Sequence, residues 1–200
     1  MLLTILSLLN LFFGIVSIIV FIKTGVPAYI FWFCNHQSFV YALAIWKRNP
    51  RWITAELNLG IIPQLLWGID YLGYVLTGKF IWGITEYMFV ENYAASTYYI
   101  SLQHFVLAPM AIYALYKIGK PTMKDWRLTV FHIFIMVALT FAFTTADYNV
   151  NCAYKNDCVP YLPENIPFWP IVWTAIVVFV IVLPTNLVLY VLYKKVLGDQ

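Results

Sequence analysis

The chain has 200 residues, of which 62% are hydrophobic and only 10% are charged, and its mean hydropathy is +0.78. A soluble domain carries about 25% charged residues, and a globule of this size cannot bury so much apolar surface. The composition therefore argues against a soluble enzyme or a disordered chain, and the net charge of +3 is too small to indicate a nucleic-acid partner. It predicts an integral membrane protein whose partners are membrane lipids.

Six apolar segments are long enough to cross a bilayer, since a helical crossing needs roughly 20 residues at 1.5 Å rise each. Unpaired backbone groups are too costly in the hydrocarbon core, so each crossing is expected to be helical. The predicted spans cover residues 2–22, 28–46, 52–76, 96–116, 128–146 and 168–193. The sequence thus predicts an all-α fold, a single polytopic bundle of six transmembrane helices over residues 1–200.

Basic residues gather in the loops on one side of these spans. Nine of the 12 lysines and arginines follow spans two, four and six, namely Lys47, Arg48, Arg51, Lys117, Lys120, Lys124, Arg127, Lys194 and Lys195. Positively charged loops stay in the cytoplasm, so both termini are expected there, in a multi-pass protein of the cell membrane. The aromatic-rich segment 78–95 then falls outside, where it is expected to lie along the membrane surface and could act as a lid.

Two of the three cysteines lie in the predicted outer loop 147–167. Cys152 and Cys158 are separated by five residues, and a close pair on an oxidising face predicts a disulfide. A zinc site is the weaker alternative, because this loop offers no second pair of ligands, and two free thiols are the third. The remaining cysteine, Cys34, falls inside the bilayer, where a free thiol is commonly a small buried hydrophobe.

Three of the predicted spans bring ionisable side chains to a common depth. Counted from the outer boundary at 1.5 Å per residue, Cys34 and His36 lie about 9–12 Å deep, Asp70 about 9 Å and His104 about 12 Å. Such groups are costly in a bilayer, so each is a candidate for function. On a regular helix Cys34 and His36 point about 200° apart, so they reach one site only if residues 34–37 are unwound.

A thiol, an imidazole and a carboxylate at one depth can supply a nucleophile, its base and an acid that orients the base. Here Cys34 would attack an acyl carbonyl, His104 would take the thiol proton, and Asp70 would fix the imidazole tautomer. The base is needed because burial suppresses the reactive thiolate. The side chains expected to contact the substrate are Asn35, His36, Ser101 and Trp67. This hypothesis predicts a lipid-directed acyl-transfer or thioesterase-type enzyme that needs no cofactor, with its Cys–His site in the outer half of the bilayer.

Three other interpretations of these polar residues stay open. They can satisfy one another across helices, which is a common packing device in membranes. His36, Asp70 and His104 form a weak candidate metal site, as two histidines and one carboxylate. Glu56 and His132 both lie about 6–8 Å from the inner boundary, so a contact between them is either a satisfied core pair, the more common case, or a proton step. The protein would then be a small transporter or an accessory subunit, with a polar path between the two depths.

Three short segments resemble a known family of membrane proteins. The central predicted helix resembles that of the YwaF-like integral membrane proteins through Tyr98-Tyr99, Gln103-His104, Pro109, Tyr113 and Leu115. The run Phe33–His36 is similar to the segment of that family that holds a paired cysteine and histidine. The asparagine-rich stretch of the family is similar to Asn149, Asn151 and Cys152 followed by Pro160.

The YwaF-like group is broadly similar to vertebrate membrane acyltransferases that use a cysteine and a histidine on ether phospholipids. The resemblance implies that Cys34 is the nucleophile and His104 the base, whereas the role of Asp70 comes from depth alone. Span three differs from the family, and its Trp67-x-x-Asp70 pattern after Pro63-Gln64 resembles uncharacterised prokaryotic polytopic membrane proteins.

Overall fold

The computed structural model describes residues 1–89, 95–156, 162 and 166–197, and within these ranges the chain forms helices and no strands. The α-helices are α1 (Leu2–Lys23), α2 (Phe33–Trp46), α3 (Pro50–Thr77), α4 (Ala95–Ser101), α5 (Leu107–Ile118), α6 (Trp126–Phe143), α7 (Trp169–Ile176) and α8 (Leu183–Leu197). Short 3₁₀ segments are η1 (Pro27–Phe31), η2 (Glu86–Phe89), η3 (Leu102–Phe105) and η4 (Val150–Cys152), and η6 (Val177–Val182) is a π-helix. The predicted all-α fold is confirmed.

Four helical stretches are long and apolar enough to cross a membrane: Leu2–Lys23, Pro50–Thr77, Trp126–Phe143 and Trp169–Val196. The last of these joins α7, η6 and α8, and the π-turns directly precede Pro184. Proline has no N–H and its ring crowds the preceding turn, so a locally widened helix accommodates it.

The other two predicted spans are not continuous helices. The stretch 28–46 begins as η1, and α2 has only 14 residues, which is about 21 Å and shorter than the hydrocarbon core. The stretch 96–116 is divided into α4, η3 and α5. Broken helices are tolerated where protein side chains satisfy the freed backbone groups. Here the N–H of Phe33 donates to Asn151 Oδ1 at 2.7 Å, and the N–H of Ala108 donates to Gln64 Oε1 at 3.1 Å.

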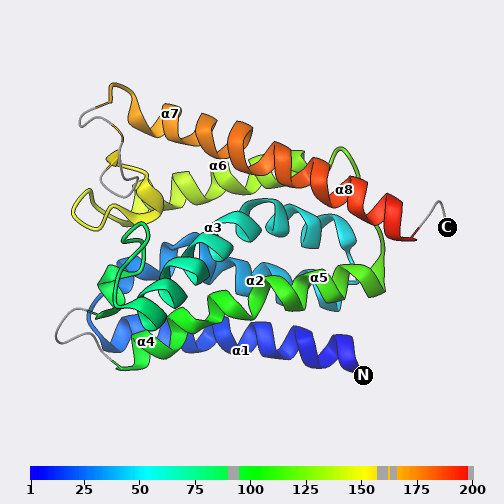
Figure 1. Cartoon of the computed structure of the whole chain (residues 1–200), viewed down its shortest axis with the longest axis horizontal. Coiled ribbons are helices and arrows are strands. Elements are labelled where there is room, and N and C mark those ends of the chain that lie inside the picture. Colours follow the sequence, from blue (N-terminus) through cyan, green and yellow to red (C-terminus); the bar gives the residue numbers. More distant parts are fainter. Residues whose placement is uncertain (90–94, 157–161, 163–165, 198–200) are drawn as a thin grey trace.

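The helices run roughly parallel, with α3 in the middle of the bundle (Figure 1). One core lies between α1, α2, α3 and α5, and a second lies between α3, α6 and the α7–η6 stretch. The N-terminus and the last turn of α8 lie at the same end of the bundle (Figure 1). We call this the basic end, because the loops 47–49 and 119–125 also lie there; the other end is the loop end.

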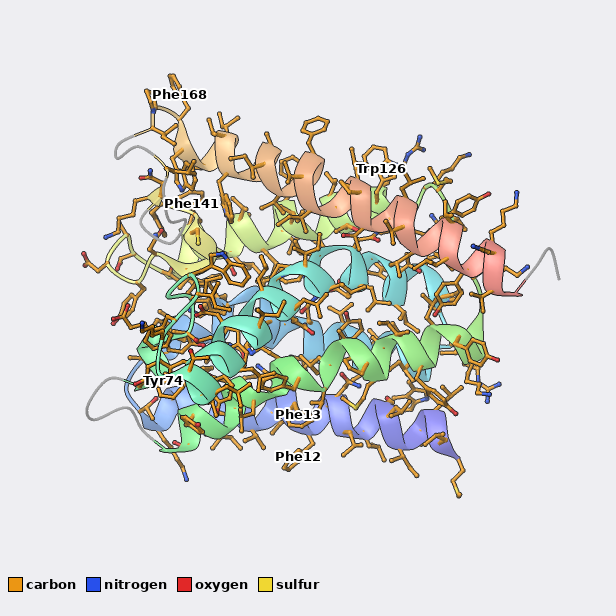
Figure 2. All side chains as sticks on the ribbon, in the orientation of Figure 1. Phe12, Phe13, Tyr74, Trp126, Phe141 and Phe168 are labelled. Carbon is orange, nitrogen blue, oxygen red and sulfur yellow. The ribbon has the colours of Figure 1, made fainter. Side chains whose placement is uncertain are left out.

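The outside of the bundle is apolar. Figure 2 shows Phe12 on α1 and Phe168 before α7 pointing away from the ribbons, and these rings are 59% and 79% exposed. Leucine, isoleucine, valine and phenylalanine side chains are exposed on every long helix. A soluble protein rarely exposes so much contiguous apolar surface, whereas a lipid-facing bundle does.

The loop end is held together by side chains that bond to backbone. Asn151 accepts from Phe33 N–H, and its Nδ2 donates to Phe31 O at 2.8 Å and Thr140 Oγ1 at 3.1 Å. Trp173 Nε1 in turn donates to Asn151 O at 2.8 Å. One asparagine side chain therefore joins the start of α2 to α6. Cys158 lies outside the described residues, so the Cys152–Cys158 disulfide stays a prediction.

The predicted surface segment 78–95 folds back onto α3 as far as it is described. Beyond α3 its only described helix is the single turn η2, and residues 90–94 lie outside the described residues. Phe80 and Phe89 pack on Tyr74 of α3, with ring centroids 4.1 and 4.2 Å away. This part of the segment is therefore packed against the bundle.

Candidate functional site

Buried and partly buried side chains, together with the exposed Tyr87, form two groups in the bundle. The cysteine cluster, towards the loop end, contains Cys34, Trp67, Tyr87, Ser101 and His104. The carboxylate cluster, nearer the basic end, contains His36, Tyr41, Glu56 and His132. Both groups draw on α2 and α3, and amide side chains lie between them.

In the cysteine cluster, Trp67 is the central contact. Its ring stacks on His104 with centroids 4.6 Å apart and planes 17° apart, and its Nε1 donates to the Tyr87 hydroxyl at 2.9 Å. The Nδ1 of His104 bonds to the Ser101 carbonyl one turn earlier. The predicted set of Trp67, Ser101 and His104 is therefore brought together, and Tyr87 joins it from η2.

Asp70 binds the loop that carries Tyr87 and does not bond to His104. Its Oδ1 accepts from the N–H groups of residues 81, 82 and 83, at 2.9, 2.7 and 3.2 Å. Its Oδ2 accepts from Thr85 N and Thr85 Oγ1, each at 2.8 Å. The predicted contact between Asp70 and the imidazole is thus wrong, because five donors from the following loop occupy the buried carboxylate.

Cys34 is the free cysteine of the described residues and is partly buried in the first turn of α2. Within the described part of the chain, no hydrogen bond joins its sulfur to His104. Tyr87 stands near it: burial raises the pKa of the Tyr87 phenol to about 12, bonds with Ser101 and Trp67 oppose this rise, and the nearby Cys34 adds to it. Tyr87 is therefore a neutral hydroxyl beside the thiol at physiological pH.

His36 lies away from the cysteine cluster. Its ring stacks on Phe31, with centroids 6.2 Å apart, and it interacts electrostatically with His132. Since α2 is regular from Phe33 onward, Cys34 and His36 face different neighbours, as the 200° separation requires. The metal set of His36, Asp70 and His104 is not assembled, and the described residues hold no other group of three metal-ligating side chains.

Amide side chains form two hydrogen-bonded groups between the two clusters. Gln103, next to His104, donates to Asn35 Oδ1 at 3.0 Å and accepts from Ser38 at 3.5 Å. Further along α2, Gln37 accepts from Gln64 Nε2 at 2.9 Å and donates to the Glu56 carbonyl at 2.8 Å. These contacts need Gly60, since a Cβ there would stand 2.3 Å from Gln37 Nε2. These amide contacts place α2 tightly against α3 and α5.

The carboxylate cluster contains a fully buried carboxyl group that is paired with a histidine. Glu56 is fully buried, and its Oε1 lies 2.7 Å from His132 Nδ1 on α6. Its Oε2 has no hydrogen-bond partner among the described residues, and neither has the fully buried Tyr41 hydroxyl, which interacts electrostatically with Glu56. The predicted Glu56–His132 contact is confirmed.

Polar side chains continue from this cluster towards the basic end. Asn58, one half-turn beyond Glu56, donates to Thr129 Oγ1 at 3.2 Å and Asn186 Oδ1 at 2.9 Å. Asn186 Nδ2 donates to the carbonyl of Thr122 in the 119–125 loop at 3.3 Å. Asn58 Oδ1 and Thr185 Oγ1 are buried without a partner among the described residues. An interrupted series of polar atoms thus reaches the surface loop.

The sequence reasoning did not assign a role to Tyr87, Asn151 or Asn186. Asn186 stands in an apolar stretch directly after Pro184-Thr185, and this polar interruption is a signal that could have found it. Tyr87 and Asn151 lie in loops, where composition gives no such signal.

No protein-family model, curated protein or solved structure matches this chain. The YwaF-like resemblance therefore stays a prediction, and the function has to be argued from the two clusters.

Proposed function

We propose that the protein moves protons across the membrane, with Glu56 and His132 as the group that binds and releases the proton. One observation carries this proposal: Glu56 is fully buried, one oxygen is held by His132, and the other has no partner among the described residues. An ionisable residue inside a membrane domain is retained at a cost of about 2.5–3.5 kcal/mol, so it marks a functional site.

The contrast with the neighbouring amides supports this interpretation. Gln37, Gln64 and Gln103 serve packing, and each bonds on both sides. Glu56 Oε2 and the Tyr41 hydroxyl have no hydrogen-bond partner among the described residues. A carboxyl–imidazole pair shares its proton in either of two forms, which lets it accept a proton from one side and give it up to the other.

The polar series on both sides of the pair supplies a route. Asn58 and Asn186 lead towards the basic end, and Gln37, Asn35 and Gln103 lead towards the loop end. Membrane proteins commonly carry protons along such series of polar groups. In this proposal Cys34 and His104 lie at the outer mouth of the route.

The proposal includes a topology of six crossings with both termini in the cytoplasm of a multi-pass cell-membrane protein. In it the α4–η3–α5 stretch and η1 with α2 count as crossings besides the four long helices. The N-terminus and the last turn of α8 at one end of the bundle, with the basic loops gathered there, support it.

The proposal predicts that Glu56→Gln abolishes proton movement. The full chain is reconstituted in liposomes that hold a pH-sensitive dye, and a potassium diffusion potential drives protons inward. Glutamine keeps the shape and one hydrogen bond but cannot exchange a proton, so we expect the initial rate to fall by about tenfold or more. The matched control is Glu86→Gln, the same change at an exposed position of η2.

Glu86→Gln should leave the rate unchanged. Wild-type liposomes that acidify no faster than empty ones, or Glu56→Gln liposomes that keep the wild-type rate, would overturn the proposal.

The second candidate function is acyl transfer from a membrane lipid to the Cys34 thiol. The observation that favours it is the place of Cys34 in the first turn of α2, beside Tyr87 of the cysteine cluster. A helix N-terminus favours a thiolate and burial opposes it, so His104 would have to take the thiol proton. The thiolate would attack an ester carbonyl, a thioester would form, and the lipid alcohol would leave with a proton from His104.

This candidate predicts that Cys34 is alkylated by iodoacetamide in native membranes and that His104→Ala slows the reaction by about tenfold. Mass spectrometry of the modified peptide measures the rate. His36→Ala is the control, because that imidazole faces away from the cysteine cluster. If Cys34 reacts only after denaturation, the thiol is a packed core residue. If it reacts equally fast in both variants, His104 is not its base.

A further inference from the structure

A groove of about 670 Å³ opens at the basic end between α1, α2 and α5. Its sides are mainly apolar, with Leu3, Leu8 and Ile45 along the helices and Trp46 at the end of α2, and the hydroxyl residues Thr4 and Ser7 also line it. Its rim carries Arg48 and Lys117, which come from two different chain segments. It is separate from both polar clusters described above.

The two rim cations are exposed and have no carboxylate partner among the described residues. Lys117 Nζ lies 5.0 Å from the Tyr116 ring centroid and 5.7 Å from that of Tyr113, so its stem follows aromatic surface. Arg48 closes α2, where its N–H donates to the Ile45 carbonyl at 3.1 Å. Both charged side chains therefore line the mouth of the groove, and neither forms an ion pair among the described residues.

One end of the groove is positively charged, and the rest of it is lined mainly by apolar side chains. Trp46 at its edge is 73% exposed, as aromatic side chains are at a membrane–water boundary. Leu8 is 58% exposed on the flank of α1, where the groove faces the apolar outside of the bundle. A ligand that fits therefore has an anionic head beside the loops and an apolar tail along α1.

We propose that this groove binds an anionic phospholipid, with its phosphate between Arg48 and Lys117 and an acyl chain along Leu3 and Leu8. Basic pockets between helices at a membrane boundary bind anionic head groups in this way. A free phosphate ion would use the rim alone and leave the apolar sides uncovered. The inference is independent of the proton proposal, because no residue of the carboxylate cluster lines the groove.

Native mass spectrometry of the full chain in detergent tests it, with dioleoyl phosphatidylglycerol and dioleoyl phosphatidylcholine as probes. Each basic side chain near a lipid surface contributes about 1 kcal/mol, so the two together give a preference for the anionic lipid of about 25-fold. The double variant Arg48→Gln/Lys117→Gln should reduce this preference to about twofold or less. Lys117→Gln alone, which leaves the end of α2 unchanged, should lower it about fivefold.

The matched control is Lys194→Gln/Lys195→Gln, which removes the same charge from the same end but on α8, outside the groove. It should keep the preference. Equal binding of the two lipids by the wild type, or an equal loss in the control, would overturn the proposal. So would competition by sn-glycerol 3-phosphate as effective as that by the lipid, since the apolar sides would then contribute nothing.

Discussion

Replacing Asp70 with alanine is expected to release the loop over residues 79–89 and lower the free energy of unfolding by roughly 4 kcal/mol. The side chain is fully buried and accepts five hydrogen bonds from residues 81–85. Without it, four backbone N–H groups lose their acceptor, and unsatisfied buried donors cost about 1–3 kcal/mol each when they cannot reach water. Unfolding in mixed detergent micelles measures the loss, and hydrogen exchange locates it.

The exchange experiment should show faster exchange at the amides of Ile81, Trp82, Gly83 and Thr85, with α6 unchanged. Asp147→Ala removes an exposed carboxylate at the same end of the bundle and should cost under about 0.5 kcal/mol. If Asp70→Ala lowers the free energy of unfolding no more than this control does, the Asp70 hydrogen bonds do not contribute to stability.

Replacing His132 with leucine is expected to destabilise the fold by about 3–5 kcal/mol, because the buried Glu56 carboxylate then loses its only side-chain partner among the described residues. The cost arises from the isolated charge and not from a lost contact. The double variant Glu56→Gln/His132→Leu removes that charge and should recover about half of the loss or more. A double-mutant cycle on the free energy of unfolding gives the coupling between the two side chains.

Phe131→Leu is the matched control, since it changes the neighbouring, lipid-facing residue of α6. It should cost under about 1 kcal/mol. Additive effects of the Glu56 and His132 changes would contradict a coupled pair, as would a double variant that is less stable than His132→Leu alone.

Hydropathy correctly predicted the four long apolar helices. It did not predict that the other two spans are broken into shorter helices. The stretches at α1, α3, α6 and α7–α8 are long apolar runs, and they form as predicted. The runs 28–46 and 96–116 contain polar residues in their middle, such as His36 and Gln103, and they break where Asn151 and Gln64 offer acceptors to freed N–H groups. Those acceptors lie on distant segments, so no local pattern announces them.

Depth along a helix identified which polar residues share a level, but it could not say which of them touch. It placed Glu56 with His132, and these two side chains are in contact. It also placed Asp70 with His104, although the carboxylate turns to the loop directly after α3. The backbone N–H groups of a short loop can bind a nearby carboxylate in place of a side chain on another helix. A count of depth along the helices does not include these loop donors.

The Asn151 bond to the start of α2 has a consequence for biosynthesis. The acceptor for the first N–H of α2 lies 118 residues further along the chain. At about 5–20 residues per second, a ribosome needs about 6–24 s to produce that partner after α2 has emerged. During this interval the N–H of Phe33 at the beginning of α2 has no acceptor from the chain. Water or an insertion factor therefore has to bind this N–H until the loop that carries Asn151 has been made.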